Sequence, residues 1–249
     1  MLTSQVKITE QEKWNSFQKE FYNSREHSRM WYDGNSHFVA SILNKFIPFA
    51  TLTTQEQILE IGCGAGRYTL PLLLRGYQLT AIDISERMLK KLQEDTDKLK
   101  IPEKQYTIMR SDIHSLNVEN DKKFDIVIGF NVLHHLFDVK NCFENIARCL
   151  KKDGRMVFLE PNALNPLHYI DTLLDRGWQA EGHKFDSLPD RVRMSLTEAG
   201  FHNIQYRRFG FFPPLLINCF PSLLKTESYT DQFKFFNKVL PYFMIKGEF

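Results

Sequence analysis

The sequence predicts an α/β fold built on a doubly wound, mostly parallel β-sheet. Between about residues 57 and 160, short β-rich runs alternate with amphipathic segments of helical length. The runs are largely apolar, as in parallel strands that helices cover on both faces. A glycine-rich turn lies between the first run and the helix after it. Together these observations favour a sheet whose ligand site lies at the carboxyl ends of the strands.

The expected elements follow in a regular order. Residues 1–50 are expected to form a helical cap, with aromatic residues spaced for one face at Trp14, Phe17, Phe21 and Tyr22. Five strands are then expected at QILEIG (57–62), YQLTAID (77–83), QYTIMR (105–110), FDIVIGF (124–130) and GRMVFLE (154–160). Helices are expected between them up to about Arg75, from Ser85 to about Leu99, and from about Asp138 to Leu150.

The pattern weakens after Glu160. A short helix is expected from Leu188 to Ala199, and two more strands at FHNIQYRRF (201–209) and PYFMIKGEF (241–249). An insertion of about 30 residues, rich in Phe, Leu and Pro, separates these strands. No linker divides the chain, so residues 1–249 are expected to form one domain, with a cap (1–50), a core (51–160) and a substrate-side part (161–249).

Composition excludes several protein classes. The chain has 249 residues, 43% hydrophobic and 25% charged, which excludes disorder and collagen. A net charge of +2 offers no extended basic surface for nucleic acid. The four cysteines form no CxxC pair and have no histidine at zinc-ligand spacing, so we expect reduced thiols and no metal site. The polar start MLTSQVKITEQEKW and the proline-broken stretch 209–224 predict a cytoplasmic protein without a membrane span.

The segment ILEIGCGAGRYTL contains the most informative pattern. Gly62, Gly64 and Gly66 follow a strand that ends in Glu60, and glycine permits a tight turn with close ligand approach. The next strand ends in Asp83, where a carboxylate can accept both hydroxyls of a ribose. A dehydrogenase is disfavoured because its G-x-G-x-x-G spacing is absent. A carboxylate at Glu60 would repel pyrophosphate, but it can orient the loop and a ligand's ammonium group. A turn that binds nothing remains the alternative.

These residues resemble the class I S-adenosylmethionine-dependent methyltransferases over about residues 36–160. The matching segments, in order, are EIGCGAG (60–66), AIDIS around Asp83, SDI (111–113), FDIVIGFNVLHHL (124–136) and LKKDGRMVFLEPN (150–162). The resemblance implies a Rossmann-like sheet of seven strands whose last strand is antiparallel. It also implies S-adenosyl-L-methionine as cofactor and methyl transfer as activity.

The resemblance assigns roles to individual residues. Gly62 and Gly64 would contact the methionine part of the cofactor, and Asp83 the ribose. Ile84, Met88 and Ile113 would pack on the adenine, whose amino group Asp112 would bind, and Asn131 would close the site. The cofactor-binding residues expected are Glu60, Gly62, Cys63, Gly64, Gly66, Asp83, Ile84, Met88, Ser111, Asp112, Ile113 and Asn131.

Histidine is the side chain best suited to remove a proton from an acceptor near neutral pH. His134 and His135 directly follow the fourth strand and are the expected catalytic residues. Neighbouring positions on a turn point differently, so we expect only one to face the acceptor. Capping of the next helix is an equal alternative for either. His27, His37 and His168 are weaker candidates.

The acceptor is expected to be a small molecule that is methylated on an O, N or C atom. The chain lacks the D/N-P-P-Y/F motif of amino-methylating DNA enzymes, a Pro-Cys nucleophile and the paired glutamates of protein arginine methyltransferases. The chain's end, from EPNALNP onward, resembles a bacterial subgroup that acts on lipid-like, quinone-like or glycan acceptors. The expected acceptor is apolar or aromatic, and lipid-, quinone- or natural-product-like. A tRNA-modifying methyltransferase and a catalytically silent cofactor-binding protein remain alternatives.

The flanks of the chain carry most of its phenylalanine. Five of the 21 Phe lie in the first fifty residues and ten in the last 49, which points to an apolar chamber for the acceptor. The run FFPPLLINCFPSLL (211–224) is open to three interpretations: a buried lid, a wall of the acceptor pocket, or a peripheral contact with a membrane surface.

Overall fold

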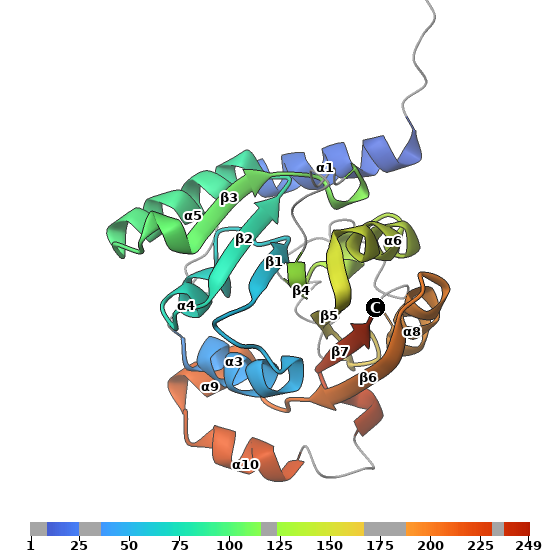
Figure 1. Cartoon of the computed structure of the whole chain (residues 1–249). Helices are drawn as coiled ribbons and strands as arrows, with labels where there is room; N and C mark the ends of the chain where they lie inside the picture. Colours follow the sequence, from blue (N-terminus) through green and yellow to red (C-terminus); the bar gives the residue numbers. More distant parts are fainter. Residues whose placement is uncertain (1–8, 25–35, 116–123, 167–187, 231–236) are drawn as a thin grey trace, which may run out of the picture.

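The computed structural model describes residues 9–24, 36–115, 124–166, 188–230 and 237–249 (Figure 1). Its described strands form one seven-stranded sheet in the order β3-β2-β1-β4-β5-β7-β6. The strands are β1 (Gln57–Ile61), β2 (Gln78–Asp83), β3 (Tyr106–Arg110), β4 (Phe124–Phe130), β5 (Leu150–Pro161), β6 (His202–Phe209) and β7 (Tyr242–Glu248). Strands β1 to β5 pair in parallel, and β7 is antiparallel to both β5 and β6. The predicted fold class is confirmed.

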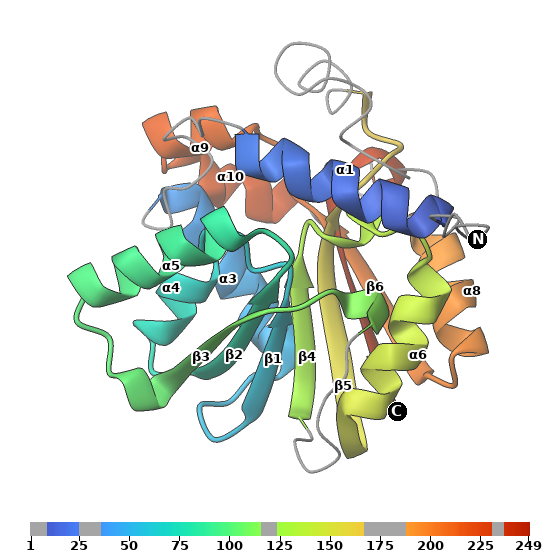
Figure 2. The ribbon, with the colours of Figure 1, turned by 90° about the horizontal axis from the view of Figure 1, so that it is seen from above.

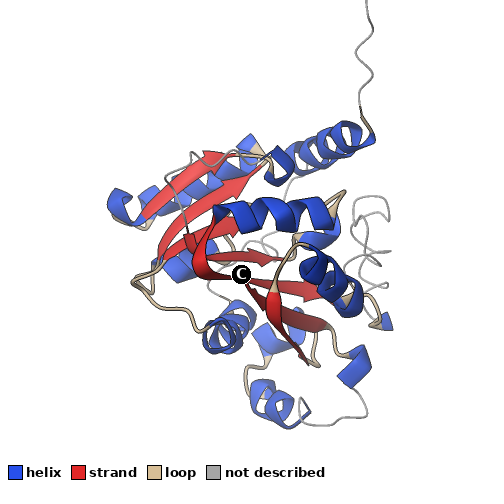
Figure 3. Cartoon of the chain, turned by 45° about the vertical axis from the view of Figure 1, so that its right-hand side comes forward, coloured by secondary structure: helices blue, strands red, loops and turns tan. Residues whose placement is uncertain are grey.

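Helices cover both faces of the sheet (Figure 3). One face carries α3 (His37–Ala50), α4 (Thr69–Leu73) and α5 (Glu86–Lys98), whose apolar side chains share one core cluster. The other face carries α6 (Val139–Cys149) and α8 (Pro189–Glu198), in a second cluster. Short 3-10 helices η1 (Glu103–Gln105), η2 (Ile113–Ser115), η3 (Leu133–His135) and η5 (Asn237–Val239) lie in the connections. The cores explain why the apolar runs form central strands: β4 is buried along nearly its whole length.

Helix starts carry the expected capping side chains. The Ser85 hydroxyl accepts the Met88 N–H at 3.3 Å, and the Asp138 carboxylate accepts the Asn141 N–H at 3.0 Å. Two boundaries differ from expectation. The helix after the glycine loop is only α4 and ends at Leu73, and β5 begins at Leu150 rather than Gly154, with an irregular register beside Phe124.

The predicted N-terminal cap contains two helices with different positions. Helix α1 (Glu10–Ser24) lies across the carboxyl-terminal edge of the sheet, whereas α3 packs on the sheet face (Figure 2). The described part of the insertion forms α9 (Pro214–Cys219) and α10 (Leu223–Thr230), which the sequence analysis did not predict. A proline at the first position of α9 is a typical helix start that could have indicated it. Among the described residues, no helix has the length and apolar character needed to cross a bilayer.

Candidate functional site

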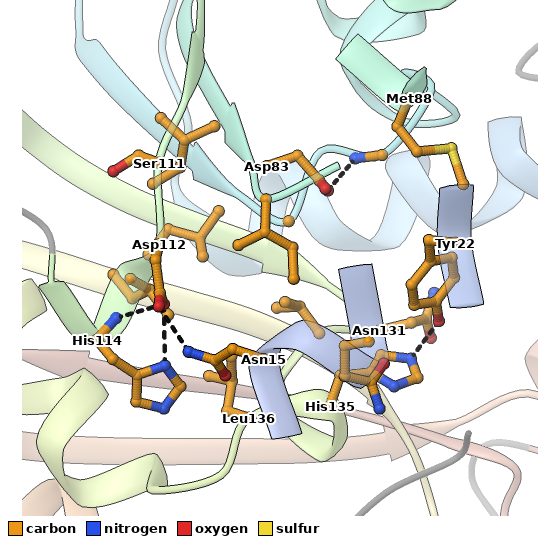
Figure 4. Close-up of a pocket in the computed structure, with 18 residues that line it drawn as sticks. Asn15, Tyr22, Asp83, Met88, Ser111, Asp112, His114, Asn131, His135 and Leu136 are labelled. Carbon is orange, nitrogen blue, oxygen red and sulfur yellow. Dashed lines mark hydrogen bonds and ion pairs between the residues drawn. The ribbon is translucent and has the colours of Figure 1, made fainter. Parts of the chain in front are cut away.

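The carboxyl ends of β1 to β4 surround a cavity of about 200 Å³ beneath α1 (Figure 4). The walls combine aliphatic side chains with a few polar groups. The lining residues are Asn15, Gln18, Tyr22, Ile61, Gly62, Gly64, Ile82, Asp83, Ile84, Met88, Ser111, Asp112, Ile113, His114, Asn131, Val132, His135 and Leu136. Of the predicted cofactor residues, Glu60, Cys63 and Gly66 do not line the cavity, and the other nine do.

The glycine loop after β1 turns sharply at the cavity. The N–H groups of Gly62 and Cys63 donate to the Ile82 carbonyl at 2.9 and 3.1 Å, which ties the loop to β2. Gly64 has φ +52°, and a Cβ placed on it would meet nothing within 4 Å, so its backbone faces open space. Gly66 has φ +88°, but its Cβ would lie 2.4 Å from Leu92 Cδ1. Gly66 therefore permits close packing of α5, and Gly64 permits close approach from the cavity.

Asp83 ends β2 and accepts hydrogen bonds from the glycine loop and from the residue that caps α5. Its Oδ2 accepts the Gly64 N–H at 2.8 Å, and its Oδ1 accepts the Ser85 N–H at 2.8 Å. Burial raises the pKa of Asp83 above its usual value, against the opposing effect of these N–H donors. Each carboxylate oxygen has two acceptor positions, so both oxygens can also accept a ligand hydroxyl.

Asp112 follows β3 and is anchored from two directions. Its Oδ1 lies 2.9 Å from the His114 backbone N and 3.0 Å from His114 Nδ1, and its Oδ2 accepts the Asn15 side-chain amide at 2.6 Å (Figure 4). Burial acts to raise the pKa of Asp112, but the bonds from His114 and Asn15 outweigh it and lower that pKa. Asp112 is thus an ionised acceptor at the cavity wall, beside Ile113.

Glu60 lies outside the cavity and is 2% exposed. Burial raises its pKa to about 8, opposed by the Thr69 hydroxyl and reinforced by Asp83. Glu60 Oε2 has no hydrogen-bond partner among the described residues. Burial, with Asp83 and Glu60 nearby, also raises the pKa of the Cys63 thiol, which is therefore protonated and unsuited to act as a nucleophile.

The two adjacent histidines point in different directions. His135 lines the cavity, and its Nε2 lies 2.9 Å from the Tyr22 hydroxyl (Figure 4). His134 is 2% exposed, and its Nδ1 lies 2.7 Å from Glu160 Oε2. Of the weaker candidates, His37 is an exposed residue at the start of α3, and His27 and His168 lie outside the described residues.

Helix α1 contributes residues that the sequence analysis missed. Asn15, Gln18 and Tyr22 all line the cavity. Their spacing of three and four residues places them on one face of a helix, the same signal that predicts the aromatic face of this segment. The Trp14 indole N–H also donates to the His135 carbonyl at 2.7 Å. Their contacts with Asp112 and His135 join positions about a hundred residues apart, which local patterns do not show.

Among the residues that the structure describes, no phenylalanine lines this cavity. Within the part of the chain that the structure describes, no group of three or more His, Cys, Asp and Glu side chains is placed to hold a metal ion.

A family model described as a methyltransferase domain matches residues 59–158. Among curated proteins, the chain is 27% identical over 169 residues to the S-adenosyl-L-methionine-dependent Diels-Alderase iccD of Talaromyces variabilis, covering 58% of each protein. It is 28% identical over 148 residues to the ubiquinone biosynthesis O-methyltransferase of Rickettsia prowazekii, covering 55% of this chain and 56% of that protein. The matches therefore span little more than half the length of these relatives.

Solved structures show the same fold at low sequence identity. Phosphoethanolamine N-methyltransferase 2 of Haemonchus contortus, in complex with S-adenosyl-L-methionine, matches with a TM-score of 0.66 and 17% identity, over 93% of this chain and 59% of that chain. The magnesium protoporphyrin IX methyltransferase of Synechocystis PCC 6803 matches with a TM-score of 0.60 and 18% identity, over 94% and 98% of the two chains.

Proposed function

Since the chain belongs to the class I S-adenosylmethionine-dependent methyltransferases, we propose that it binds S-adenosyl-L-methionine and methylates a small acceptor. The observation that carries this proposal is the convergence of Asp83, Asp112 and the Gly62–Gly64 backbone on one cavity. These groups come from the ends of three neighbouring parallel strands, where ligands of open α/β sheets bind.

The residues present fit this cofactor. The open space beside Gly64 admits a ligand against the backbone, and Asp83 offers two acceptor oxygens to a ribose. Aliphatic walls from Ile84, Met88 and Ile113 suit a flat purine ring, and Asp112 is an ionised acceptor for its amino group. Bound S-adenosylmethionine supplies a methyl group on a positively charged sulfur.

His135 is the proposed proton acceptor. It lines the cavity, and its Nε2 is oriented by the Tyr22 hydroxyl at 2.9 Å, so a proton that leaves an acceptor O–H or N–H has a fixed site to occupy. His134 cannot serve directly, because it is buried against Glu160. Replacing His135 by Ala should lower turnover about 100-fold, the ordinary scale of general-base catalysis. His134→Ala is the matched variant. If both variants turn over as fast as the wild-type protein, neither histidine is catalytic.

The acceptor class is proposed from the relatives. The names of these relatives, ubiquinone biosynthesis O-methyltransferase and Diels-Alderase, indicate that they act on small molecules. We therefore propose an apolar or aromatic acceptor. Calorimetry with S-adenosylhomocysteine tests cofactor binding, and absence of heat with wild-type protein would refute the proposal. Incubation of extracts with labelled S-adenosylmethionine, followed by mass analysis, should show a labelled product heavier than its precursor by CH2, because the methyl group replaces a hydrogen that leaves as a proton.

The Diels-Alderase relative provides a second candidate function. Cofactor-dependent cyclisation would use the same cavity without transferring the methyl group. The mass analysis distinguishes the two, because a cyclised product has the mass of its precursor.

We also propose that the insertion rests on a membrane surface. Phe211, Leu215, Leu216 and Phe220, in and beside α9, are 40–60% exposed, and Ile217 of α9 is fully buried. This apolar patch belongs to a stretch without charges, from Phe209 to Leu224, on elements at the cavity edge of the sheet (Figure 2). Full-length protein should sediment with vesicles of equal parts phosphatidylcholine and phosphatidylglycerol, and the double variant Phe211→Ser/Phe220→Ser should not. Equal sedimentation of the two proteins would refute the contact.

A further inference from the structure

Glu160 is a buried carboxyl group that the proposed chemistry does not use. It lies at the carboxyl end of β5, is 0% exposed and does not line the cavity. Its Oε1 accepts the N–H groups of Val132 and Leu133 at 2.8 and 2.9 Å, and its Oε2 lies 2.7 Å from His134 Nδ1. All three partners lie shortly after β4, at Val132 and the first two residues of η3, a segment that we call the 132–134 turn.

Burial of a carboxyl group is costly unless its oxygens are bonded. The three hydrogen bonds of the Glu160 carboxyl group all go to the 132–134 turn, so this side chain fixes the turn relative to β5. Asn131, directly before this turn, lies in the left-handed region at φ +54°, which asparagine adopts more readily than most other residues with a side chain. The Asn131 N–H donates to the Leu159 carbonyl at 2.7 Å. Residues of β5 therefore bind both Asn131 and the 132–134 turn that follows it.

The turn places two groups at the cavity. Val132 packs against the glycine loop, because a Cβ on Gly62 would lie 2.4 Å from Val132 Cγ2. His135 directly follows the turn: its N–H donates to the Val132 carbonyl at 3.0 Å, and its ring centroid lies 4.0 Å from that of His134. A shift of the turn would therefore move the glycine loop and His135 together.

We propose that Glu160 is a positioning residue, which holds the 132–134 turn so that Val132 seats against the glycine loop and His135 faces the cavity. His134 bonds to the second carboxyl oxygen of Glu160. This buried histidine therefore helps to fix the turn, without contact with substrate. The inference rests on the proposed function for the proton transfer by His135 and for cofactor binding at the glycine loop.

The chain offers a matched control for Glu160. Glu227 of α10 is 4% exposed, its Oε1 accepts the N–H groups of Phe211 and Phe212 at 2.8 and 3.2 Å, and its Oε2 lies 3.1 Å from Lys45 Nζ. It thus binds two consecutive backbone groups and a basic side chain, as Glu160 does, but none of its recorded partners lines the cavity.

The experiment compares E160Q with E227Q in the full chain, because glutamine keeps the size of the side chain and loses its charge. Trp14 is a natural reporter, since its indole N–H donates to the His135 carbonyl. Its indole signal in ¹H–¹⁵N NMR spectra is assigned by comparison with a Trp14→Phe variant. We expect E160Q to shift this signal, to speed amide exchange at Val132 and Leu133 about tenfold, and to weaken S-adenosylhomocysteine binding about 3- to 10-fold, since charged acceptors form stronger hydrogen bonds than neutral ones.

E227Q should speed exchange at Phe211 and Phe212, and leave the Trp14 signal and ligand affinity within twofold of wild type. An unchanged Trp14 signal in E160Q, or an equal change in E227Q, would overturn the positioning role. If wild-type protein binds no S-adenosylhomocysteine, the proposed function fails, and the Trp14 signal and amide exchange still decide the role of Glu160.

Discussion

The cavity edge of the sheet and the aromatic flanks are held together by different forces. At the cavity edge, backbone N–H groups of the loops donate hydrogen bonds to short side chains such as Asp83 and Asp112, which fixes the loop backbone. In the flanks, α3 and its neighbours are held by ring packing, as between Phe46 and Phe130, whose centroids lie 4.5 Å apart. The shape of a binding loop therefore depends on its local backbone conformation, which a short motif can specify. The stability of a flank depends instead on apolar side chains that fill the core volume.

The difference gives a new meaning to the phenylalanine excess. Phe46, Phe209 and Phe243 are fully buried in the core, and Phe211 and Phe220 are exposed. None of these residues lines the cavity beneath α1. The described flanks thus contribute phenylalanine to the core and to the surface patch, rather than to the wall of this cavity.

The largest expected effect concerns Glu60, a buried carboxyl group near the cavity edge whose pKa is strongly raised. Glu60 has a folded-state pKa of about 8, raised by burial from 4.5. The folded protein therefore binds more protons than the unfolded chain between these pH values, so the free energy of unfolding falls as pH rises from 4.5 to 8. The expected loss is of the order of 4 kcal/mol.

Glu60→Gln cannot ionise and should lack this loss. Urea unfolding of both proteins at several pH values between 5 and 8.5 measures it. Parallel stability profiles for the two proteins would show that Glu60 is not the buried group that makes the cavity edge sensitive to pH.

Substitutions of two glycines of the loop should distinguish effects on stability from effects on ligand binding. Gly62→Ala combines left-handed strain at φ +66° with a contact of 2.4 Å to Val132, and should lower the free energy of unfolding by about 3 kcal/mol. Gly64→Ala has the strain at φ +52° without the contact, so about 1 kcal/mol is expected. Its methyl group enters open space at the cavity and should weaken S-adenosylhomocysteine binding. Urea unfolding and calorimetry test both, and equal destabilisation by the two variants would contradict the packing role of Gly62.

The sequence predicted the cavity edge more fully than the flanks for a physical reason. The strand ends at Asp83 and Asp112 and the glycine turn are local features, each readable within a few residues. The pairing of Asn15 with Asp112, and of Tyr22 with His135, depends on how α1 crosses the sheet edge, and no local pattern records that path. Helix α9 was missed because prolines and a uniformly apolar run hid its periodicity, and α10 because its eight residues are too few to show a periodic pattern.

Asp83 tests whether the cavity edge binds ligand through a charge. Asp83→Asn retains the size of the side chain but loses the charge that would accept ribose hydroxyls, so affinity for S-adenosylhomocysteine should fall about 10- to 100-fold. Asp125→Asn is the control, because Asp125 binds Lys151 and the Gln57 N–H outside the cavity. Calorimetry on both variants measures the effect, and equal affinities would contradict the role of Asp83.

The smallest expected effect lies in the exposed patch of the flank. Phe220 is 60% exposed and Phe211 is 44% exposed, so replacing either by Ser removes little buried apolar area. Each change should alter the free energy of unfolding by less than about 0.5 kcal/mol, as is usual for surface positions. Ile217→Ser, on the buried side of α9, should instead lower it by about 2 kcal/mol, because a buried apolar side chain is lost and a hydroxyl enters the core. Urea unfolding of the three variants measures this contrast. If Phe220→Ser were as destabilising as Ile217→Ser, this side chain would be part of the core, and loss of vesicle binding in the double variant would no longer indicate a membrane contact.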